Sequence, residues 1–159
     1  MKIAWKKPRD SHIIYEALSA LADGRLKLID SHKATCESTS RGKSYEIEFD
    51  PATSSIMSND NMAYYAREVS YPMAAMFLIK EIYAFDKNIL HYFKDIRWKD
   101  INQKNGNNYM KSVDEVLRGL EKQGVATGYI KKMAQKIYDD ISSATWYMLG
   151  ERRAPPNVY

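Results

Sequence analysis

The sequence predicts an α+β fold, in which an N-terminal helix and a small antiparallel β-meander of about three strands precede a C-terminal bundle of four to five helices. Three observations predict it. Apolar residues recur at helical spacing over residues 13–21 and alternate with polar residues between residues 26 and 57. Helical spacing then returns from residue 62 onward, so the two kinds of structure follow each other along the chain.

The chain has 159 residues, a length typical of one domain with a substantial core. We expect a single α+β domain over residues 1–150, with the helix and the meander in residues 1–61 and the helical part in residues 62–150. Residues 151–159 contain two adjacent prolines and are expected to form an extended polar tail.

The first helix is expected to begin after Asp10 or Ser11, either of which can cap it, and to end at Gly24. Its buried face would consist of Ile13, Ile14, Ala17, Leu18, Ala20 and Leu21. From Arg25 the apolar residues alternate with polar ones, through Leu26, Leu28, Ala34, Cys36, Tyr45, Ile47 and Phe49. A last strand is expected at residues 55–58, which completes the meander.

The helical part is predicted to contain helices at residues 72–85, 87–97, 112–123 and 127–148. The first of these is apolar on all sides and should be the central helix. Asp86 would cap the second, and the sequence from Ser112 to Glu115 matches a capping box at the start of the third.

The composition excludes several classes of protein. Hydrophobic residues make up 45% and charged residues 28% of the chain, which is typical of a folded, soluble protein. The longest apolar run, residues 72–79, falls well short of the roughly 20 residues that a membrane span needs, so no membrane partner is expected. The single cysteine, Cys36, and the lack of an apolar segment after the basic N-terminus favour a cytoplasmic location.

Positive charge gathers in two segments of a chain whose net charge is +4, residues 1–9 and 87–111. If residues 87–98 form a helix, a basic and aromatic strip faces solvent, opposite the apolar side of that helix. We define the basic strip as Lys87, His91, Lys94, Arg97, Trp98, Lys99 and Lys104. These residue types suit nucleic-acid contact, while a solvated surface is the plainer interpretation. Trp146 projects off the apolar face of the last predicted helix, which with Trp98 suggests a surface for self-association unless the sheet covers it.

No segment matches a catalytic, metal-binding or phosphate-binding motif. Gly42-Lys43-Ser44 resembles the end of a P-loop, but Glu37 replaces the first glycine and a strand follows, which predicts a hairpin turn. His32 and Cys36 lack further zinc ligands nearby, so no metal site is expected. The carboxylates of Glu46, Glu48 and Asp50 are interpreted as the solvated face of a strand.

The leading interpretation is a small intracellular, non-enzymatic binding or assembly protein, without cofactor or catalytic residues. It would form a homo-oligomer, or contact a protein or nucleic-acid partner, through the basic strip and Trp146. The alternative is a small enzyme whose active site is assembled from His, Asp and Glu residues that are dispersed in the sequence.

Overall fold

The computed structural model describes residues 1–156 and has a five-stranded sheet with helices before and after it, which confirms the α+β fold. The strands are β1 (Leu26–Leu28), β2 (Lys33–Glu37), β3 (Ser44–Asp50), β4 (Ser55–Ser58) and β5 (Tyr147–Met148). The α-helices are α1 (His12–Ala22), α2 (Tyr71–Ile79), α3 (Trp98–Lys104), α4 (Tyr109–Lys122) and α5 (Gly128–Ser143). Three short helices complete the described part of the chain: the 3-10 helices η1 (Pro51–Thr53) and η3 (Lys87–Phe93), and the π-helix η2 (Met62–Ala66).

The sheet is antiparallel from β1 to β4, as the alternation of apolar residues predicts. Along β3, Tyr45, Ile47 and Phe49 are buried, and the residues between them are exposed or half-buried. Residues 1–156 form five strands rather than about three. A turn over residues 29–32 separates β1 from β2, and β5 adds a strand from the far end of the chain.

Strand β5 pairs in parallel with β4, with Ser55 opposite Tyr147. The prediction of one helix to Met148 is therefore wrong, because α5 ends at Ser143. The packing of the Trp146 ring explains why the helix ends before Met148. The centroid of this ring lies 4.3 Å from that of the Phe77 ring and 5.9 Å from that of the Phe49 ring. Burying the indole there requires the chain to leave the helix and cross the sheet edge.

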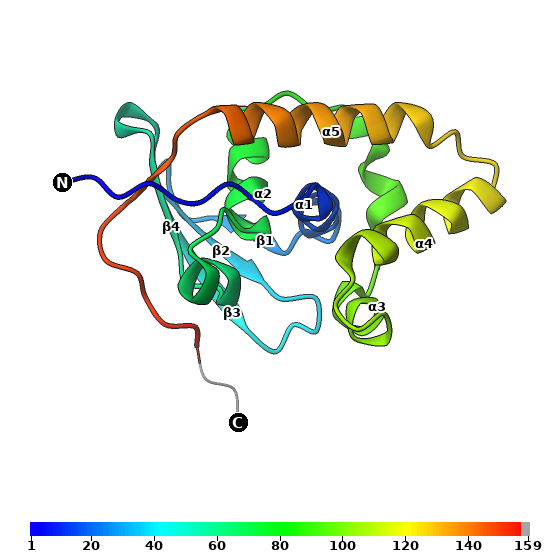
Figure 1. Cartoon of the computed structure of the whole chain (residues 1–159), viewed down its shortest axis with the longest axis horizontal. Coiled ribbons are helices and arrows are strands. Elements are labelled where there is room, and N and C mark those ends of the chain that lie inside the picture. Colours follow the sequence, from blue (N-terminus) through cyan, green and yellow to red (C-terminus); the bar gives the residue numbers. More distant parts are fainter. Residues whose placement is uncertain (157–159) are drawn as a thin grey trace.

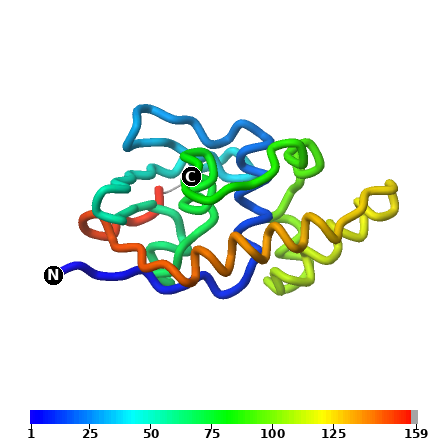
Figure 2. Tube along the Cα trace, turned by 90° about the horizontal axis from the view of Figure 1, so that it is seen from above, coloured from blue at the N-terminus to red at the C-terminus, as the bar shows by residue number. Residues whose placement is uncertain are grey.

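Helix α1 packs against the other helices and so organises the core. It contacts α2, α4, α5 and η3, and Figure 1 shows it end-on, with α5 above it and α4 to its right. Helix α2 contacts β1, β3 and β4, and its residues from Pro72 to Leu78 are all buried, as the prediction of a central helix requires. In Figure 2 the connection between α4 and α5 projects at the end opposite the N-terminus.

The predicted helix at residues 87–97 is not present as one helix. Its first part is η3, which Asp86 caps by accepting the backbone N–H of Asn88 at 2.9 Å. Asp95 then adopts a left-handed backbone, with a φ of 60°, and donates its backbone N–H to Asp23 at 2.7 Å. This long-range hydrogen bond interrupts the chain before α3 begins at Trp98.

Helix α4 begins three residues before the predicted capping box. Asn108 caps it by accepting the backbone N–H of Lys111 at 3.2 Å. Ser112 is fully buried inside the helix and accepts the side-chain amide of Asn105 at 3.1 Å, so it cannot serve as the cap. No helix within residues 1–156 combines the length and apolarity needed to cross a membrane.

Candidate functional site

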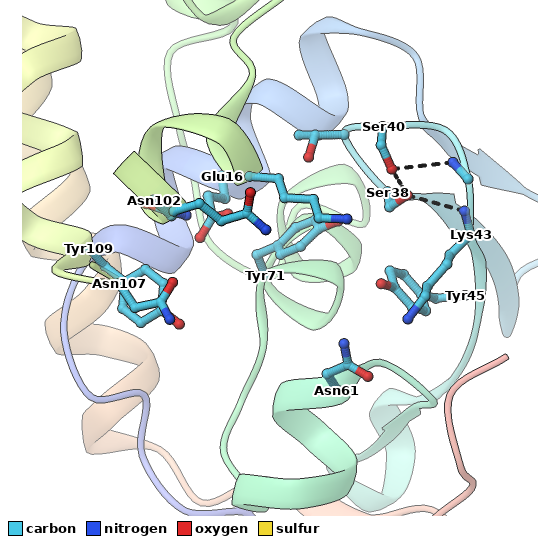
Figure 3. Close-up of a pocket in the computed structure, with 14 residues that line it drawn as sticks. Glu16, Ser38, Ser40, Lys43, Tyr45, Asn61, Tyr71, Asn102, Asn107 and Tyr109 are labelled. Atoms are coloured by element: carbon cyan, nitrogen blue, oxygen red, sulfur yellow. Dashed lines mark hydrogen bonds between the residues drawn. The ribbon is translucent and has the colours of Figure 1, made fainter. Parts of the chain in front are cut away.

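A cavity of about 360 Å³ lies where α1, the loop between β2 and β3, and α3 meet (Figure 3). A second hollow of about 190 Å³ adjoins it. Both hollows are lined by Glu16, Tyr45, Asn61, Tyr71 and Tyr109, so we treat them as one cavity and call it the Glu16 cleft. Together they have the size and the mixture of aromatic and polar side chains that small-molecule sites show.

Three acid-base side chains form a row that ends in the cleft: Asp10, His12 and Glu16. The Nδ1 atom of His12 is hydrogen-bonded to Oδ1 of Asp10, and its Nε2 atom lies 3.3 Å from Oε2 of Glu16. Asp10 also accepts the backbone N–H of His12 at 2.9 Å. The imidazole is therefore hydrogen-bonded at Nδ1 and lies close to a carboxylate oxygen at Nε2, and its side chain is only 4% exposed.

Helical geometry and a tyrosine ring position this row. His12 and Glu16 are four residues apart at the start of α1, which places them on the same side of the helix. The Tyr109 ring, at the first residue of α4, stacks on the imidazole with 4.4 Å between centroids and 12° between planes. Asp10, just before α1, fills the role of a cap, whereas Ser11 makes no capping hydrogen bond.

The carboxyls at the two ends of the row have opposite pKa shifts. Desolvation by burial raises the pKa of Glu16 to about 7, against smaller opposing effects of His12 and Arg25. Partial burial also favours the neutral form of Asp10, but the hydrogen bonds from His12 outweigh it and lower the pKa of Asp10. Asp10 is thus the permanent anion, and Glu16 is the group that changes protonation near neutral pH.

Two tyrosines form the wall of the cleft, Tyr45, which is buried, and Tyr71, which is half-buried. Tyr45 comes from β3 and Tyr71 from the first residue of α2. Desolvation raises the pKa of Tyr45 to about 12 and that of Tyr71 well above its ordinary value, so both hydroxyls stay protonated. They can donate hydrogen bonds to a ligand without taking part in proton transfer at neutral pH.

The buried carboxyl of Asp60 anchors the segment that carries Asn61 to the cleft. It accepts the hydroxyls of Ser58 and Ser70, both at 2.6 Å, and the backbone N–H of Ala63 at 2.9 Å. Residue 62 opens the π-helix η2, and such helices occur frequently beside functional sites. Desolvation raises the pKa of Asp60, but its oxygens are already occupied by protein donors.

The mouth of the cleft combines hydroxyl groups with two lysines. Lys43 ends the loop between β2 and β3, and Lys99 lies in the first turn of α3. As the sequence predicted, Gly42-Lys43-Ser44 is part of a hairpin connection and opens no helix. Asn102, three residues after Lys99 on α3, is 8% exposed, and its Oδ1 atom is buried without a hydrogen-bond partner within residues 1–156.

The described part of the chain, residues 1–156, holds no group of three or more His, Cys, Asp or Glu side chains arranged to bind a metal ion. Cys36 is fully buried, and burial raises its pKa to about 12, so its thiol is a packing group. What the cleft offers chemically is therefore hydrogen bonding, positive charge at the mouth and a titratable carboxyl.

The residues of the basic strip do not share one helical face. Lys87 and His91 lie on η3, Lys94 lies after it, and Arg97, Lys99 and Lys104 lie at or within α3. All six are exposed, and Lys99 is the member that lines the Glu16 cleft. Acidic partners neutralise three of them: Glu81 pairs with Lys87 at 3.3 Å, Asp100 with Arg97 at 2.8 Å and Glu115 with Lys104 at 2.8 Å.

Both tryptophans are buried, which contradicts the predicted exposure of Trp98 and agrees with the alternative that the sheet covers Trp146. Trp98 is 1% exposed and donates its indole N–H to the Ser19 hydroxyl at 2.7 Å. Trp146 is 8% exposed and donates to the Tyr83 hydroxyl at 3.0 Å. Both predictions assumed a continuous helix, and the helix breaks before each tryptophan turn the rings into the core.

The Asp10–His12–Glu16 row was not predicted from the sequence. A local signal was present, since a histidine and a glutamate four residues apart at the start of a helix must share a side of it. This spacing by itself does not predict a functional site, because the cleft also needs Tyr45, Tyr71 and Tyr109 from three later segments.

One family profile, described as "Uncharacterised conserved protein UCP014422", matches residues 5–147. This span contains the whole Asp10–His12–Glu16 row and every residue that lines the cleft. No curated protein and no solved structure matches the chain significantly.

Proposed function

We propose that this chain, which belongs to the family described as uncharacterised conserved protein UCP014422, is a small enzyme that performs general acid-base chemistry on a polar small molecule bound in the Glu16 cleft. The row Asp10–His12–Glu16 carries the proposal, because it ends in a carboxyl whose pKa is about 7. A group whose pKa lies near the working pH both accepts and returns a proton readily.

The proposed proton path uses each member of the row differently. Oε2 of Glu16 faces His12, so Oε1 is expected to take a proton from the ligand and return it. When the Nδ1–H of the neutral imidazole is donated to Asp10, Nε2 can accept the O–H of protonated Glu16. The ionised Asp10 would stabilise the imidazolium that forms if the proton moves on to His12.

The cleft supports a small-molecule ligand better than a nucleic acid. Its two hollows together accommodate a molecule of metabolite size, and their lining mixes rings with hydroxyl and amide groups. Stacking on single-stranded bases needs exposed aromatic rings, and the burial of Trp98 removes the ring that the basic strip was expected to offer. The enzyme interpretation therefore replaces the non-enzymatic one as the leading proposal.

Nucleic-acid contact through Lys87, His91, Lys94, Arg97 and Lys104, and self-association, stay predictions. Light-scattering mass at low and high salt, with and without a mixed oligonucleotide pool, tests both. Retention of oligonucleotide that is lost at high salt would support the first, and a dimer that is indifferent to salt would support the second.

The proposed activity is tested by incubating the pure protein with a pooled extract of small molecules and following all components by mass spectrometry. At least one compound should be consumed, and one product formed, by the wild-type protein but not by the Glu16→Gln variant. Removing a positioned general acid-base group typically lowers a rate by about 100- to 10,000-fold, which would abolish visible turnover in such an assay.

Glu81→Gln is the matched control, because Glu81 is 73% exposed and lies outside the cleft. This variant should consume the same compound as the wild-type protein. If wild type and Glu16→Gln gave the same result, with or without turnover, Glu16 would have no catalytic role and the proposal would fail.

A further inference from the structure

We infer that the ligand of the Glu16 cleft is an anionic small molecule, whose negatively charged group is held by Lys43 and Lys99 at the mouth of the cleft. This inference rests on the proposed function and names its substrate class. Three features support it: the charge of the mouth, the hydroxyl-rich loop beside it, and an unpaired polar group inside the cleft.

The two lysines differ from the arginines next to them. Arg41 pairs with Glu37 and Arg97 pairs with Asp100, each at 2.8 Å, so neither needs a further anion. Within residues 1–156, Lys43 and Lys99 have no acidic side chain within ion-pair distance. Two cations from segments far apart in the sequence therefore meet at one opening without a protein anion to neutralise them, which favours an anionic ligand.

The loop between β2 and β3 brings further donors to the same opening. The hydroxyl of Ser38 accepts the backbone N–H of Lys43 at 3.2 Å, and that of Ser40 accepts the backbone N–H of Gly42 at 3.4 Å. The two hydroxyls are also hydrogen-bonded to each other at 3.3 Å, and the three bonds fix the loop (Figure 3, dashed lines). One hydroxyl hydrogen is used between the two serines, which leaves the other able to point at a bound group. Preformed sites of this kind lose little entropy when an anion binds.

Asn102 supplies an independent sign that a ligand belongs in the cleft. Its side chain lines the cavity, is more than nine-tenths buried, and keeps an Oδ1 atom without a hydrogen-bond partner in residues 1–156. Buried polar atoms in native proteins are nearly always paired. An N–H or O–H of the ligand in this place would satisfy the oxygen, while its anionic end remains at the lysines.

Glu16, the acid inside the cleft, does not oppose this assignment. Its pKa of about 7 means that it is substantially neutral at neutral pH. The positive mouth and the weakly charged interior would therefore orient the ligand, with the anionic end outward and the reacting part toward Glu16.

The test measures the binding of sulfate, inorganic phosphate, pyrophosphate and citrate by NMR titration, with sodium chloride added so that all samples have equal ionic strength. Probes of so few atoms are expected to bind with a Kd of roughly 1 to 10 mM. Backbone signals of residues 38–43 and 99–103 should shift together, because these segments form the mouth.

Three lysine variants separate the cleft from general attraction by positive charge. Lys43→Met and Lys99→Met should each weaken binding about tenfold, as expected for the loss of one charge-assisted hydrogen bond. Lys94→Met is the matched control, since Lys94, like Lys99, is exposed and without an ion pair in residues 1–156 but lies outside the cleft. It should leave the Kd unchanged.

Two results would overturn the inference: no saturable shift with any of the four probes, or an equal loss of affinity in the Lys94→Met variant. Tighter binding of a single-stranded oligonucleotide than of pyrophosphate, weakened by Lys94→Met as well, would also overturn it in favour of a nucleic-acid surface. Glu16→Gln should bind the anions at least as tightly as wild type. Anion binding without turnover that depends on Glu16 would therefore refute the proposed catalysis and leave the anion site standing.

Discussion

At the scale of single residues, one carboxyl links stability to pH. Burial raises the pKa of Glu16 from its ordinary value of 4.5 to about 7, so the folded state binds this proton more tightly than the unfolded state does. The stability that the proton contributes is fully present below pH 4.5 and is lost as the pH rises through 7.

Glu16→Gln removes this dependence, because an amide has no proton to lose. The free energy of unfolding of the wild-type protein, minus that of the variant, should fall by up to about 3 kcal/mol between roughly pH 5 and roughly pH 8. Urea unfolding of both proteins at several pH values measures the difference, and the effects of other titrating groups largely cancel in it. A difference that stays constant over this range would contradict a raised pKa at Glu16.

Predictions for single residues were right where the burial of the residue depends on residues close to it in the sequence. Cys36 is buried, as expected for a small apolar residue on the inner face of a strand. Trp98 was predicted to be exposed and is buried, because its partner is the hydroxyl of Ser19, 79 residues earlier. No local pattern encodes such a contact.

At the scale of elements, helix α4 and the residues just after it contain two glycines whose backbones have opposite requirements. Gly124 follows the helix, has a φ of +87°, and donates its N–H to the carbonyl of Glu121 at 2.9 Å. Gly119 lies inside the helix, where an added Cβ would meet no atom within 4 Å. The first position needs glycine and the second does not.

Gly119→Ala should therefore stabilise the protein by about 0.5 to 1 kcal/mol, and Gly124→Ala should destabilise it by about 1 kcal/mol. Thermal and urea unfolding of the two variants measure both changes. Each variant controls for the other, since the substitution is identical and the two sites are five positions apart. Equal effects of the same sign would show that α4 does not end where we place it.

The sequence predicted most elements and missed those that depend on distant contacts. Alternation located β3, the turn at residues 50–53 located β4 after it, and the apolar segment after Pro72 located α2. The helix expected at residues 87–97 is interrupted because the backbone of Asp95 is held by Asp23 from the end of α1. Helix propensity within the segment could not show this.

At the scale of the whole molecule, the last strand ties the end of the chain to the start. Backbone N–H groups of Trp5 and Tyr147 donate to Trp146 and Ser54 respectively, both at 2.8 Å. The indole of Trp146 fills the space beside Phe77. The core is therefore completed by a segment that a helix prediction placed on the surface.

Trp146→Ala should lower the free energy of unfolding by about 3 to 5 kcal/mol, the cost of emptying a buried tryptophan site. Arg153→Ala is the control in the adjoining tail. It removes only exposed ion pairs, with Glu46 at 3.3 Å and Glu48 at 3.4 Å, and should cost less than about 1 kcal/mol. Urea unfolding of the two variants checks both values, and similar small costs would mean that Trp146 is not part of the core.

The tail illustrates how far such predictions reach. Residues 151–156 form no helix or strand, and they do not simply extend into solvent. Arg152 donates to the backbone carbonyl of Tyr64, and Arg153 pairs with carboxylates of β3. The predicted tail also includes residues 157–159, which lie outside the described residues.

The sequence by itself determined the fold class, the order of the main elements and the buried faces of α1, α2 and β3, because apolar spacing within a segment decides which side of it leaves water. Only the tertiary structure decided that β5 joins the sheet, that both tryptophans are buried, and that α1 meets the β2–β3 loop and α3 at one cleft. These features depend on contacts between residues far apart in the chain, which leave no periodic pattern in either partner.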